Sequence, residues 1–410
     1  MMKHHILLSI IAATALTACV DFDDATTPIS AKVQLTLPAE MNANDGLEGR
    51  TIVMSNTSGT ISMQATTDAQ GVATFAGITP DVYNISTSWE ITGEQYRQMT
   101  GDNQVVRSCT LSGSLNSHLI REEQTIGLTT ILSINRDIVI GKVYYAGAKD
   151  NNNKNYLTGS YLELFNQADD TIDISGLYIG LLDAGSTMAY TLDNLHEQHA
   201  DSVVLLKQIF RIPTDANKQV APGGTILLVN SAIDHSLYCP MEHSLADADF
   251  EAKDVNMSYT NNPAVPALEA IYLQQNTTIS NMNLVRGGPC GVVIFNTDDD
   301  VSQWPRTYKY PNTETKGAQW VLLPKRYILD GVDLLKYKST GVDIQTKRLY
   351  TEIDAGYFTM TSVNGLDGEV VYRKTASQRS AGSHLLLEDT NNSSNDFHVS
   401  KTIKPRQYDE

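Results

Sequence analysis

The sequence is poor in the residues that form cross-links, redox pairs and aromatic platforms. Its 410 residues include four cysteines and three tryptophans, and no two cysteines are spaced as Cys-x-x-Cys. A thioredoxin-like redox pair and a zinc ribbon therefore have no support. Basic residues are also scarce, because 30 Lys and Arg stand against 47 Asp and Glu, for a formal net charge of −17. This balance argues against nucleic-acid binding and against adhesion to anionic lipid.

Catalytic motifs are missing as well. The sequence contains no GxSxG elbow, no phosphate-binding loop, no GxGxxG turn and no SxxK set. Carboxylates are so numerous that no pair stands out as a glycosidase dyad. We therefore expect a binding protein that is not an enzyme. A hydrolase of surface polymers, with its site in inserted loops, and a structural or adhesive envelope protein are the alternatives.

The apolar run that bears on membrane attachment lies at the N-terminus. Lys3 precedes a short apolar run that is too brief to span a bilayer and ends in Leu16-Thr17-Ala18-Cys19. This segment resembles the lipobox of bacterial lipoprotein signal peptides. The resemblance implies that residues 1–18 are a signal peptide and that the thiol of Cys19 carries the lipid anchor. The alternative is an ordinary secretory signal in which the cysteine stands by chance.

Residues 19–30 are expected to form an acidic tether between the lipid and the first domain. The run Val20-Asp21-Phe22-Asp23-Asp24 resembles the export signal that Bacteroidota place after the lipidated cysteine. That resemblance implies a protein anchored in the outer membrane and exposed at the cell surface. A plain solvated linker is the alternative reading of the same charges.

Residues 31–137 show the period of short β-strands. In residues 32–37, Val33, Leu35 and Leu37 alternate with polar residues and share one face. The stretch 67–86, with its turn at Thr67-Asp68-Ala69-Gln70-Gly71, resembles prealbumin-like and carboxypeptidase-regulatory-like β-sandwiches. The resemblance implies a β-sandwich in this first domain.

Residues 138–410 are expected to form a second, larger β-domain with inserted loops. The run YLELFNQADDTIDISGLYI at 161–179 resembles the opening strands of a lamin-tail domain, which is an immunoglobulin-like β-sandwich. Residues 220–229 resemble the Pro-Gly turn and strand of that domain, and 389–406 resemble its closing segment. The predicted fold class is therefore all-β, with two immunoglobulin-like sandwiches, the second lamin-tail-like.

Taken together with the lipobox, the blocks from 138 to 406 resemble an uncharacterised family of Bacteroidota surface lipoproteins. The likeness extends to the short motifs at 232–235, 248–251 and 354–357. It implies location and architecture, and it implies a TonB-dependent outer-membrane receptor as partner, since such lipoproteins commonly accompany these receptors. It brings no catalytic residue. The leading hypothesis is an accessory subunit that binds a ligand during nutrient or metal uptake.

Long loops are predicted at 236–285 and 296–320, and such loops often carry binding sites. The densest group of metal-ligating residues begins the first of them, with His235, Cys239, Met241 and His243. Soft sulfur ligands together with imidazole suit copper, or zinc if the methionine does not coordinate the metal. A packed His235 and a buried Cys239 are the structural alternative.

Three further features leave alternatives open. Trp304 and Trp320 either stack a sugar or peptide ring or pack in the core. The Asx-rich loops at 150–155 and 389–393 offer partial calcium ligand sets, with self-satisfied turns as the alternative. Beyond Cys19, an odd number of cysteines remains, which permits one disulfide plus a thiol or three buried thiols. These cysteines are Cys109, Cys239 and Cys290.

Overall fold

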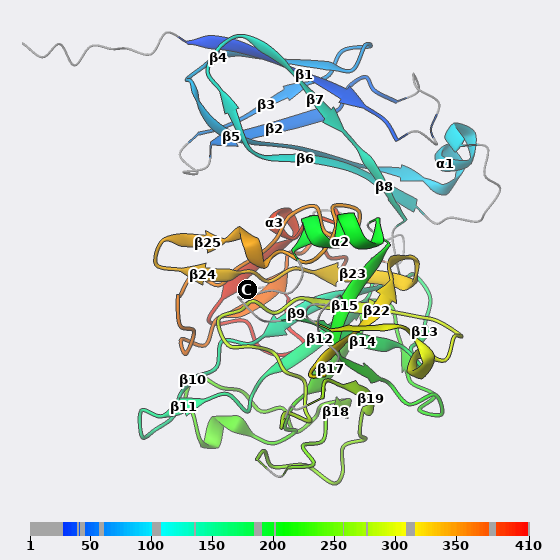
Figure 1. The fold of residues 1–410 in the computed structure, drawn as a ribbon, viewed down its shortest axis with the longest axis vertical. Coiled ribbons are helices and arrows are strands. Elements are labelled where there is room, and N and C mark those ends of the chain that lie inside the picture. The colour runs from blue at the N-terminus through cyan, green and yellow to red at the C-terminus, as the bar shows by residue number, and fades with distance from the viewer. Residues whose placement is uncertain are drawn as a thin grey trace, which may run out of the picture.

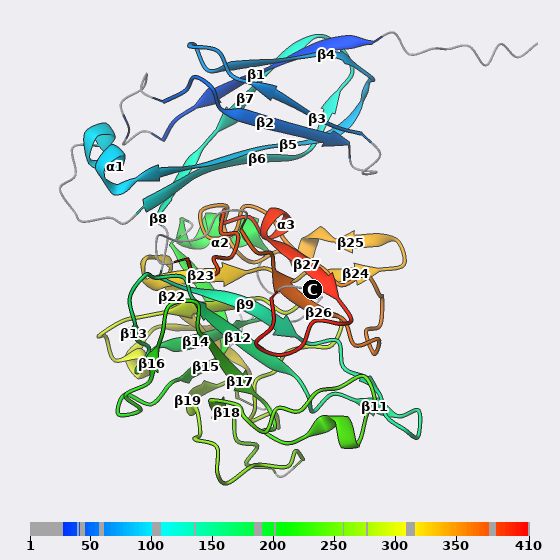
Figure 2. The ribbon, with the colours of Figure 1, turned by 180° about the vertical axis from the view of Figure 1, so that it is seen from behind.

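The computed structural model describes residues 28–408, apart from 39–40, 42–45, 57–60, 101–107, 135–136, 184–190, 201, 257, 276–277, 309–315 and 377–382. The expected signal peptide and Cys19 lie outside these residues. Within the described part of the chain, none of the helices combines the length and the apolar character that a membrane span requires. Figures 1 and 2 show the strands gathered into two bodies, one built from β1–β8 and the other from β9–β27.

The first body is a sandwich of a three-stranded and a five-stranded sheet. The smaller sheet has the order β4-β1-β7, in which β1 pairs antiparallel with β4 and parallel with β7. The larger sheet has the order β3-β2-β5-β6-β8, and α1 connects β5 to β6. The elements are β1 (Ile29–Thr36), β2 (Thr51–Asn56), β3 (Ser62–Thr66), β4 (Val72–Ile78), β5 (Asp81–Thr92), α1 (Gly93–Thr100), β6 (Ser108–Ile120), β7 (Gln124–Thr129) and β8 (Ile131–Ile134).

Alternation along the strands produces this sandwich. In β1, Val33 and Leu35 are buried while Lys32 and Thr36 are exposed, so one face of the strand meets the opposite sheet. Their apolar side chains join those of Phe75 and Leu111 in one core cluster. The predicted strand period in this part of the chain is therefore the one that the structure uses.

The second body contains a six-stranded and a seven-stranded sheet. The first has the order β18-β17-β12-β9-β26-β27. The second has the order β21-β22-β15-β14-β20-β23, with β19 paired to β15. The strands of the first are β9 (Ile138–Tyr144), β12 (Tyr161–Asn166), β17 (Thr225–Val229), β18 (Phe250–Glu251), β26 (Val370–Arg373) and β27 (Phe397–Ser400). Those of the second are β14 (Tyr178–Leu182), β15 (Val203–Arg211), β19 (Glu269–Leu273), β20 (Val292–Phe295), β21 (Arg306–Tyr308), β22 (Gln319–Pro324) and β23 (Ile328–Val332).

Short elements lie in the connections between these strands. They are β10 (Ala148–Lys149), β11 (Asn155–Tyr156), β13 (Ile172–Asp173), α2 (Leu192–His199), β16 (Gln219–Val220), η1 (His235–Leu237), η2 (Val301–Gln303), η3 (Lys325–Tyr327), β24 (Lys336–Lys338), β25 (Gly341–Asp343), η4 (Ile344–Thr346) and α3 (Ser393–Asp396).

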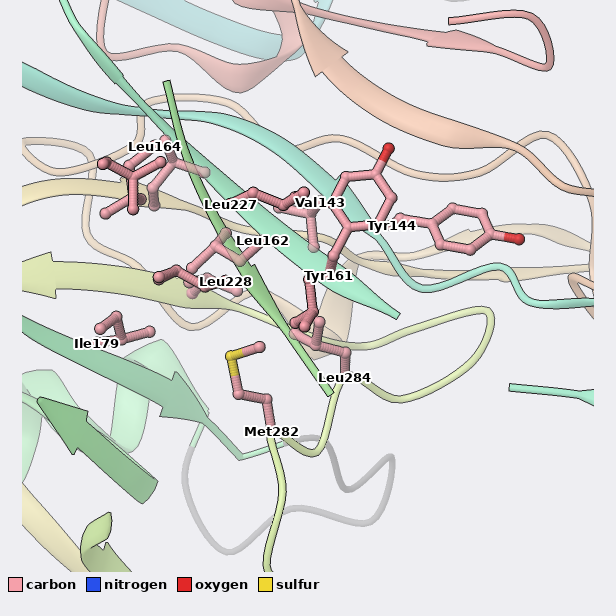
Figure 3. Packing of buried hydrophobic residues seen from close by; sticks show 14 of the residues in the cluster. Val143, Tyr144, Tyr161, Leu162, Leu164, Ile179, Leu227, Leu228, Met282 and Leu284 are labelled. Carbon is pink, nitrogen blue, oxygen red and sulfur yellow. The ribbon is translucent and has the colours of Figure 1, made fainter. Parts of the chain in front are cut away.

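The central strands of the six-stranded sheet are buried on both faces. Every residue of β9 and β12 is buried, including Lys142 and Glu163. One face contributes Leu162 and Leu164 to a core shared with the second sheet (Figure 3). The other face contributes Val139 and Phe165 to a smaller cluster with Tyr408 near the C-terminus. The final segment of the chain thus covers the outer face of the sheet.

The predicted all-β class with sandwiched sheets is confirmed. The stretch 161–179, which resembles the opening strands of a lamin-tail domain, contains β12 and the start of β14. The predicted closing segment forms α3 and β27.

Candidate functional site

A cavity of about 320 Å³ opens among the long connections of the second body. We call it the loop pocket, and it is lined by Tyr145, Leu157, Ser160, Asn230, Asp254, Ser258, Tyr259 and residues 278–279 and 281–286. Most of these residues belong to the stretch 236–285, in which the sequence predicts a long insertion. The volume lies at the lower end of the range that is usual for small-molecule sites.

One wall of the loop pocket is shaped by a single carboxylate. Asp254 accepts hydrogen bonds from the backbone N–H groups of Asn256, Ser258 and Tyr259, at 2.8–3.0 Å. The hydroxyl of Ser280 donates a further one at 2.7 Å, which ties this wall to the opposite segment. Burial raises the pKa of Asp254, but these donors outweigh it and bring the pKa below its ordinary value. Asp254 is therefore an ionised structural residue whose acceptor sites are occupied.

The floor of the loop pocket is an extended segment held by buried amides. The side chain of Asn230 donates to the carbonyl of Met282 at 2.8 Å and accepts from its N–H at 2.9 Å. Gln208 donates to the carbonyl of Asn281 at 3.0 Å and accepts from the N–H of Asn283 at 2.8 Å. These amides satisfy backbone groups that have no neighbouring strand, which a buried segment requires.

Side chains of this floor segment connect the loop pocket to the core. Met282 and Leu284 are buried and belong to the same cluster as Tyr161 and Leu162 (Figure 3). The position of the floor is consequently fixed by core packing. A site built on such a rigid base is pre-organised for binding.

Two cations lie at the edge of the loop pocket. Arg286 lines it, and a Cβ placed on the adjacent Gly287 would lie 3.4 Å from Nζ of Lys336, so this ammonium approaches the same edge. In the described part of the chain, neither Arg286 nor Lys336 forms an ion pair with a carboxylate. Burial and then the neighbouring Arg286 and Lys338 lower the pKa of Lys336. Lys338 itself is paired with Asp343 at 2.5 Å.

The residues predicted to hold a metal are divided between two places. His235 is fully buried, with Nδ1 2.7 Å from the hydroxyl of Tyr156 and Nε2 2.8 Å from the carbonyl of Ser231. The thiol of Cys239 is buried and donates to the carbonyl of Lys149 at 3.1 Å. Both side chains are thus engaged by the protein, as in the structural alternative.

Met241 and His243 lie elsewhere, around a cavity of about 10 Å³ next to Glu242. This volume admits about one water molecule. Within the described ranges, no group of three or more His, Cys, Asp or Glu side chains lies close enough to share a metal ion. Copper or zinc binding by these residues stays a prediction.

Glu242 is a perturbed carboxyl that the sequence analysis did not select. It is 5% exposed, and the hydroxyl of Tyr144 donates to its Oε1 at 2.7 Å. Burial raises the pKa of Glu242 to about 7, against the opposing effect of the Tyr144 hydrogen bond. A Cβ on Gly159 would meet the carboxylate of Glu242, so a larger residue at 159 would displace this side chain. A lone Glu in an acidic chain gives no sequence signal of such burial.

Replacing Glu242 by glutamine should remove a pH dependence of stability. Because the pKa is raised in the folded state, the contribution of Glu242 is fully present below its ordinary pKa of 4.5 and is lost as the pH rises through about 7. The free energy of unfolding of the wild type should fall by about 3 kcal/mol more than that of Glu242→Gln between pH 4.5 and 8. Urea denaturation at several pH values measures both. Glu197→Gln, at an exposed position of α2, is the control, and parallel curves for Glu242→Gln and the wild type would contradict the expectation.

Both candidate stacking residues pack against the second sheet. Trp320 is 7% exposed and belongs to the cluster formed by β14, β15, β20 and β22. Trp304 is half-buried, stacks on Tyr327 at 5.7 Å between ring centroids, and contacts Phe295 at the same distance. Neither tryptophan lines the loop pocket.

The two candidate calcium loops use their oxygens internally. Oδ1 of Asp150 accepts from the N–H groups of Asn152 and Lys154, both at 2.8 Å. In the second loop, Asp389 accepts from Arg373 at 3.0 Å, and Ser393 donates to Asp354 at 2.6 Å. Calcium binding at either loop stays a prediction.

The three cysteines beyond the predicted anchor are not joined in disulfides. Cys109, Cys239 and Cys290 are all buried, which agrees with the second of the two arrangements that their odd number permits. Burial raises the pKa of the Cys290 thiol to about 11, so it is protonated and unreactive at neutral pH.

Comparison with known proteins gives a family model that is similar to part of the chain. Residues 221–403 match the family model described as "Protein of unknown function (DUF4876)". The fold resembles the crystal structure of a DUF4876 family protein from Bacteroides thetaiotaomicron, with a TM-score of 0.56 and 18% sequence identity over 90% of this chain and 95% of that one. The predicted resemblance to an uncharacterised family of Bacteroidota is thereby confirmed.

Other likenesses are much weaker. A proposed carbohydrate-binding protein from Pseudomonas aeruginosa covers 25% of this chain and 89% of its own, at 14% identity and a TM-score of 0.19. A DUF3823 family protein from Parabacteroides merdae covers 49% and 79%, at 9% identity and a TM-score of 0.16. Scores of this size carry no argument about the present chain. No protein of curated function matches it.

Proposed function

We propose that this chain, whose residues 221–403 match the model of the DUF4876 family of proteins of unknown function, is a surface lipoprotein that binds a small ligand without transforming it. The observation that carries this proposal is the loop pocket. It is a cavity of about 320 Å³ on a rigid floor, and it lies largely within the segment that matches the family. Its lining consists mainly of hydroxyls, amides and apolar side chains, a combination suited to binding.

The lining also favours binding over hydrolysis. Asp254 is the carboxylate among the described lining residues of the loop pocket, and its oxygens already accept hydrogen bonds from four donors of the surrounding protein. A general acid or base must be available to the substrate proton. A carboxylate whose acceptor sites are already filled by the loop stabilises the loop instead.

The lipobox-like segment and acidic tether support a place at the outer membrane, anchored through Cys19. The family resemblance supports a TonB-dependent receptor as partner, to which the lipoprotein would present its ligand. We expect that the native lipoprotein, purified from outer membranes in mild detergent, brings a barrel of this class with it in stoichiometric amount. Recovery of the lipoprotein alone would remove the receptor from the proposal and leave an independent surface binder.

Filling the loop pocket should abolish ligand binding. Ser258 is exposed at its rim, so Ser258→Trp places an indole over the cavity without disturbing the core. The matched control is Val255→Trp in the same loop, where the side chain is 76% exposed and does not line the pocket. Both variants should keep the wild-type melting temperature. Screening against arrayed oligosaccharides and peptides should show binding by wild type and Val255→Trp, and at least about a tenfold loss for Ser258→Trp. Equal binding by all three proteins would contradict the assignment of the loop pocket as the binding site.

A further inference from the structure

The charge at the edge of the loop pocket opposes that of the whole molecule. The chain has a formal net charge of −17, yet Arg286 and Lys336 lie together here without a carboxylate partner in the described part of the chain. Both are half-buried, so water compensates them only in part. Two neighbouring like charges are held in place by the fold at a cost that a bound anion would remove.

The described residues of the loop pocket do not supply that anion. Among the described lining residues, Asp254 is the single carboxylate, and it accepts hydrogen bonds from backbone donors and from Ser280. Lys338, the next cation along β24, shows the contrasting case, because it is already paired with Asp343. With respect to the described carboxylates, the guanidinium of Arg286 is therefore available to a ligand.

The rest of the lining identifies the kind of molecule that would carry the anion. Ser160, Ser258, Thr278 and Asn281 contribute hydroxyl and amide groups, while Tyr259 contributes an aromatic ring. Hydroxyls and amides match the hydroxyl groups of a sugar, and aromatic and apolar surfaces match its C–H faces. A planar guanidinium matches a carboxylate through two parallel hydrogen bonds.

From these observations, and resting on the binding role proposed above, we infer that the loop pocket takes a saccharide bearing a carboxylate. Arg286 binds the carboxylate directly, and Lys336 adds attraction from the same edge. The polar lining binds the sugar hydroxyls. Residues 278–286 thus supply both the floor and the charge that selects acidic over neutral sugars.

The test uses the full mature lipoprotein in mild detergent and isothermal titration calorimetry. The probes are galacturonate trisaccharide, hyaluronan tetrasaccharide and sialyllactose, each compared with its carboxyl methyl ester, together with a hexaglutamate peptide. At least one acidic saccharide should bind, and its methyl ester should bind roughly ten- to a hundredfold more weakly. Arg286→Gln should weaken the acidic saccharide by the same factor without affecting the ester, and Arg286→Lys should fall between Arg286→Gln and the wild type.

The Lys pair of β24 provides the matched control. Lys336→Gln should weaken acidic saccharides about threefold, with a smaller effect at high salt, because it acts through space. Lys338→Gln, two residues away and already paired, should leave the affinity unchanged. Circular dichroism of each variant establishes that it is folded.

Each other result decides between the inference and the proposed function. Equal affinity for an acid and its ester, or unchanged affinity in Arg286→Gln, overturns the inference while Ser258→Trp still tests the binding role. Tighter binding of hexaglutamate than of every saccharide overturns the saccharide class. Binding of neutral saccharides only, abolished by Ser258→Trp, overturns the inference and preserves the proposed function. Absence of binding to every probe and to the arrays overturns both.

Discussion

Replacing Arg373 by methionine should lower the free energy of unfolding by about 3 to 5 kcal/mol, because it leaves buried carboxylates without their cation. Arg373 is 1% exposed at the end of β26. Its guanidinium donates to Asp330 at 2.8 Å, to Asp389 at 3.0 Å and to Asp396 at 3.2 Å. Arg373 therefore joins β23, β26 and the segment that closes the second body.

The loss should depend on pH in a defined direction. Burial raises the pKa of Asp330 to about 6 and that of Asp396 to about 7, while Arg373 opposes both shifts. Without the guanidinium these pKa values rise further. A carboxyl with a raised folded-state pKa contributes stability below its unfolded pKa and loses it as the pH rises. Arg373→Met should consequently be more destabilised relative to wild type at pH 8 than at pH 5.

Urea denaturation at these two pH values measures the effect. Arg326→Met removes an arginine that is exposed in the same body, and it should unfold like the wild type. Arg373→Lys keeps the charge but not the fork that reaches several acceptors, so it should be intermediate. A loss at pH 8 no greater than at pH 5 would show that the guanidinium does not hold these carboxyls in their ionised form.

The β-class of this protein is readable from its sequence because one-sided burial imposes a period of two. Val33, Leu35 and Leu37 alternate, and the structure places Val33 and Leu35 in the core from β1. The turn at Gly71 is equally local, since its φ of +76° favours glycine and Asp68 accepts from Gln70 and Val72. Patterns that depend on neighbours in the chain thus predict the first body well.

In the second body, such local patterns no longer predict which residues are buried. Strands β9 and β12 are covered on both faces, so Lys142 and Glu163 are buried although a charged residue in a strand predicts a solvent-facing position. The partner that buries them is the C-terminal segment, more than 200 residues away along the chain. No periodicity reports a contact of that kind.

The same limit applies to the site. The insertion at 236–285 could be predicted from its lack of strand period, and the loop pocket lies mostly there. The residues that hold its floor could not be predicted, because Asn230 and Gln208 act through hydrogen bonds to backbone groups 52 and 73 residues away. The composition of residues 235–243 predicts a metal site. In the structure, however, the histidines and the thiol of this segment lie in two different surroundings.

The buried pair of Lys142 and Glu163 gives the second large expected effect. Nζ of Lys142 lies 3.0 Å from Glu163, donates to the carbonyl of Lys404 at 3.2 Å, and stands 4.0 Å from the ring centroid of Tyr408. Glu163 also accepts from the N–H of Arg406 at 2.7 Å. The pair thereby attaches the last described residues of the chain to the sheet. Lys142→Met should lower the free energy of unfolding by about 3 to 5 kcal/mol, since the carboxyl of Glu163 is left buried without its cation.

A second substitution separates the effect of the unpaired buried carboxyl from the effect of the lost packing. In Lys142→Met/Glu163→Gln the charge is gone, but the amide oxygen still accepts from Arg406, so the double variant should recover about 1 to 2 kcal/mol relative to Lys142→Met. Hydrogen exchange at the Arg406 amide should be faster in Lys142→Met and slower again in the double variant. Lys401→Met, which changes an exposed lysine of the same segment, should alter neither measurement. If the double variant were less stable than Lys142→Met, the pair would act mainly through attraction and packing. Removing the unpaired buried carboxyl would in that case not raise the free energy of unfolding.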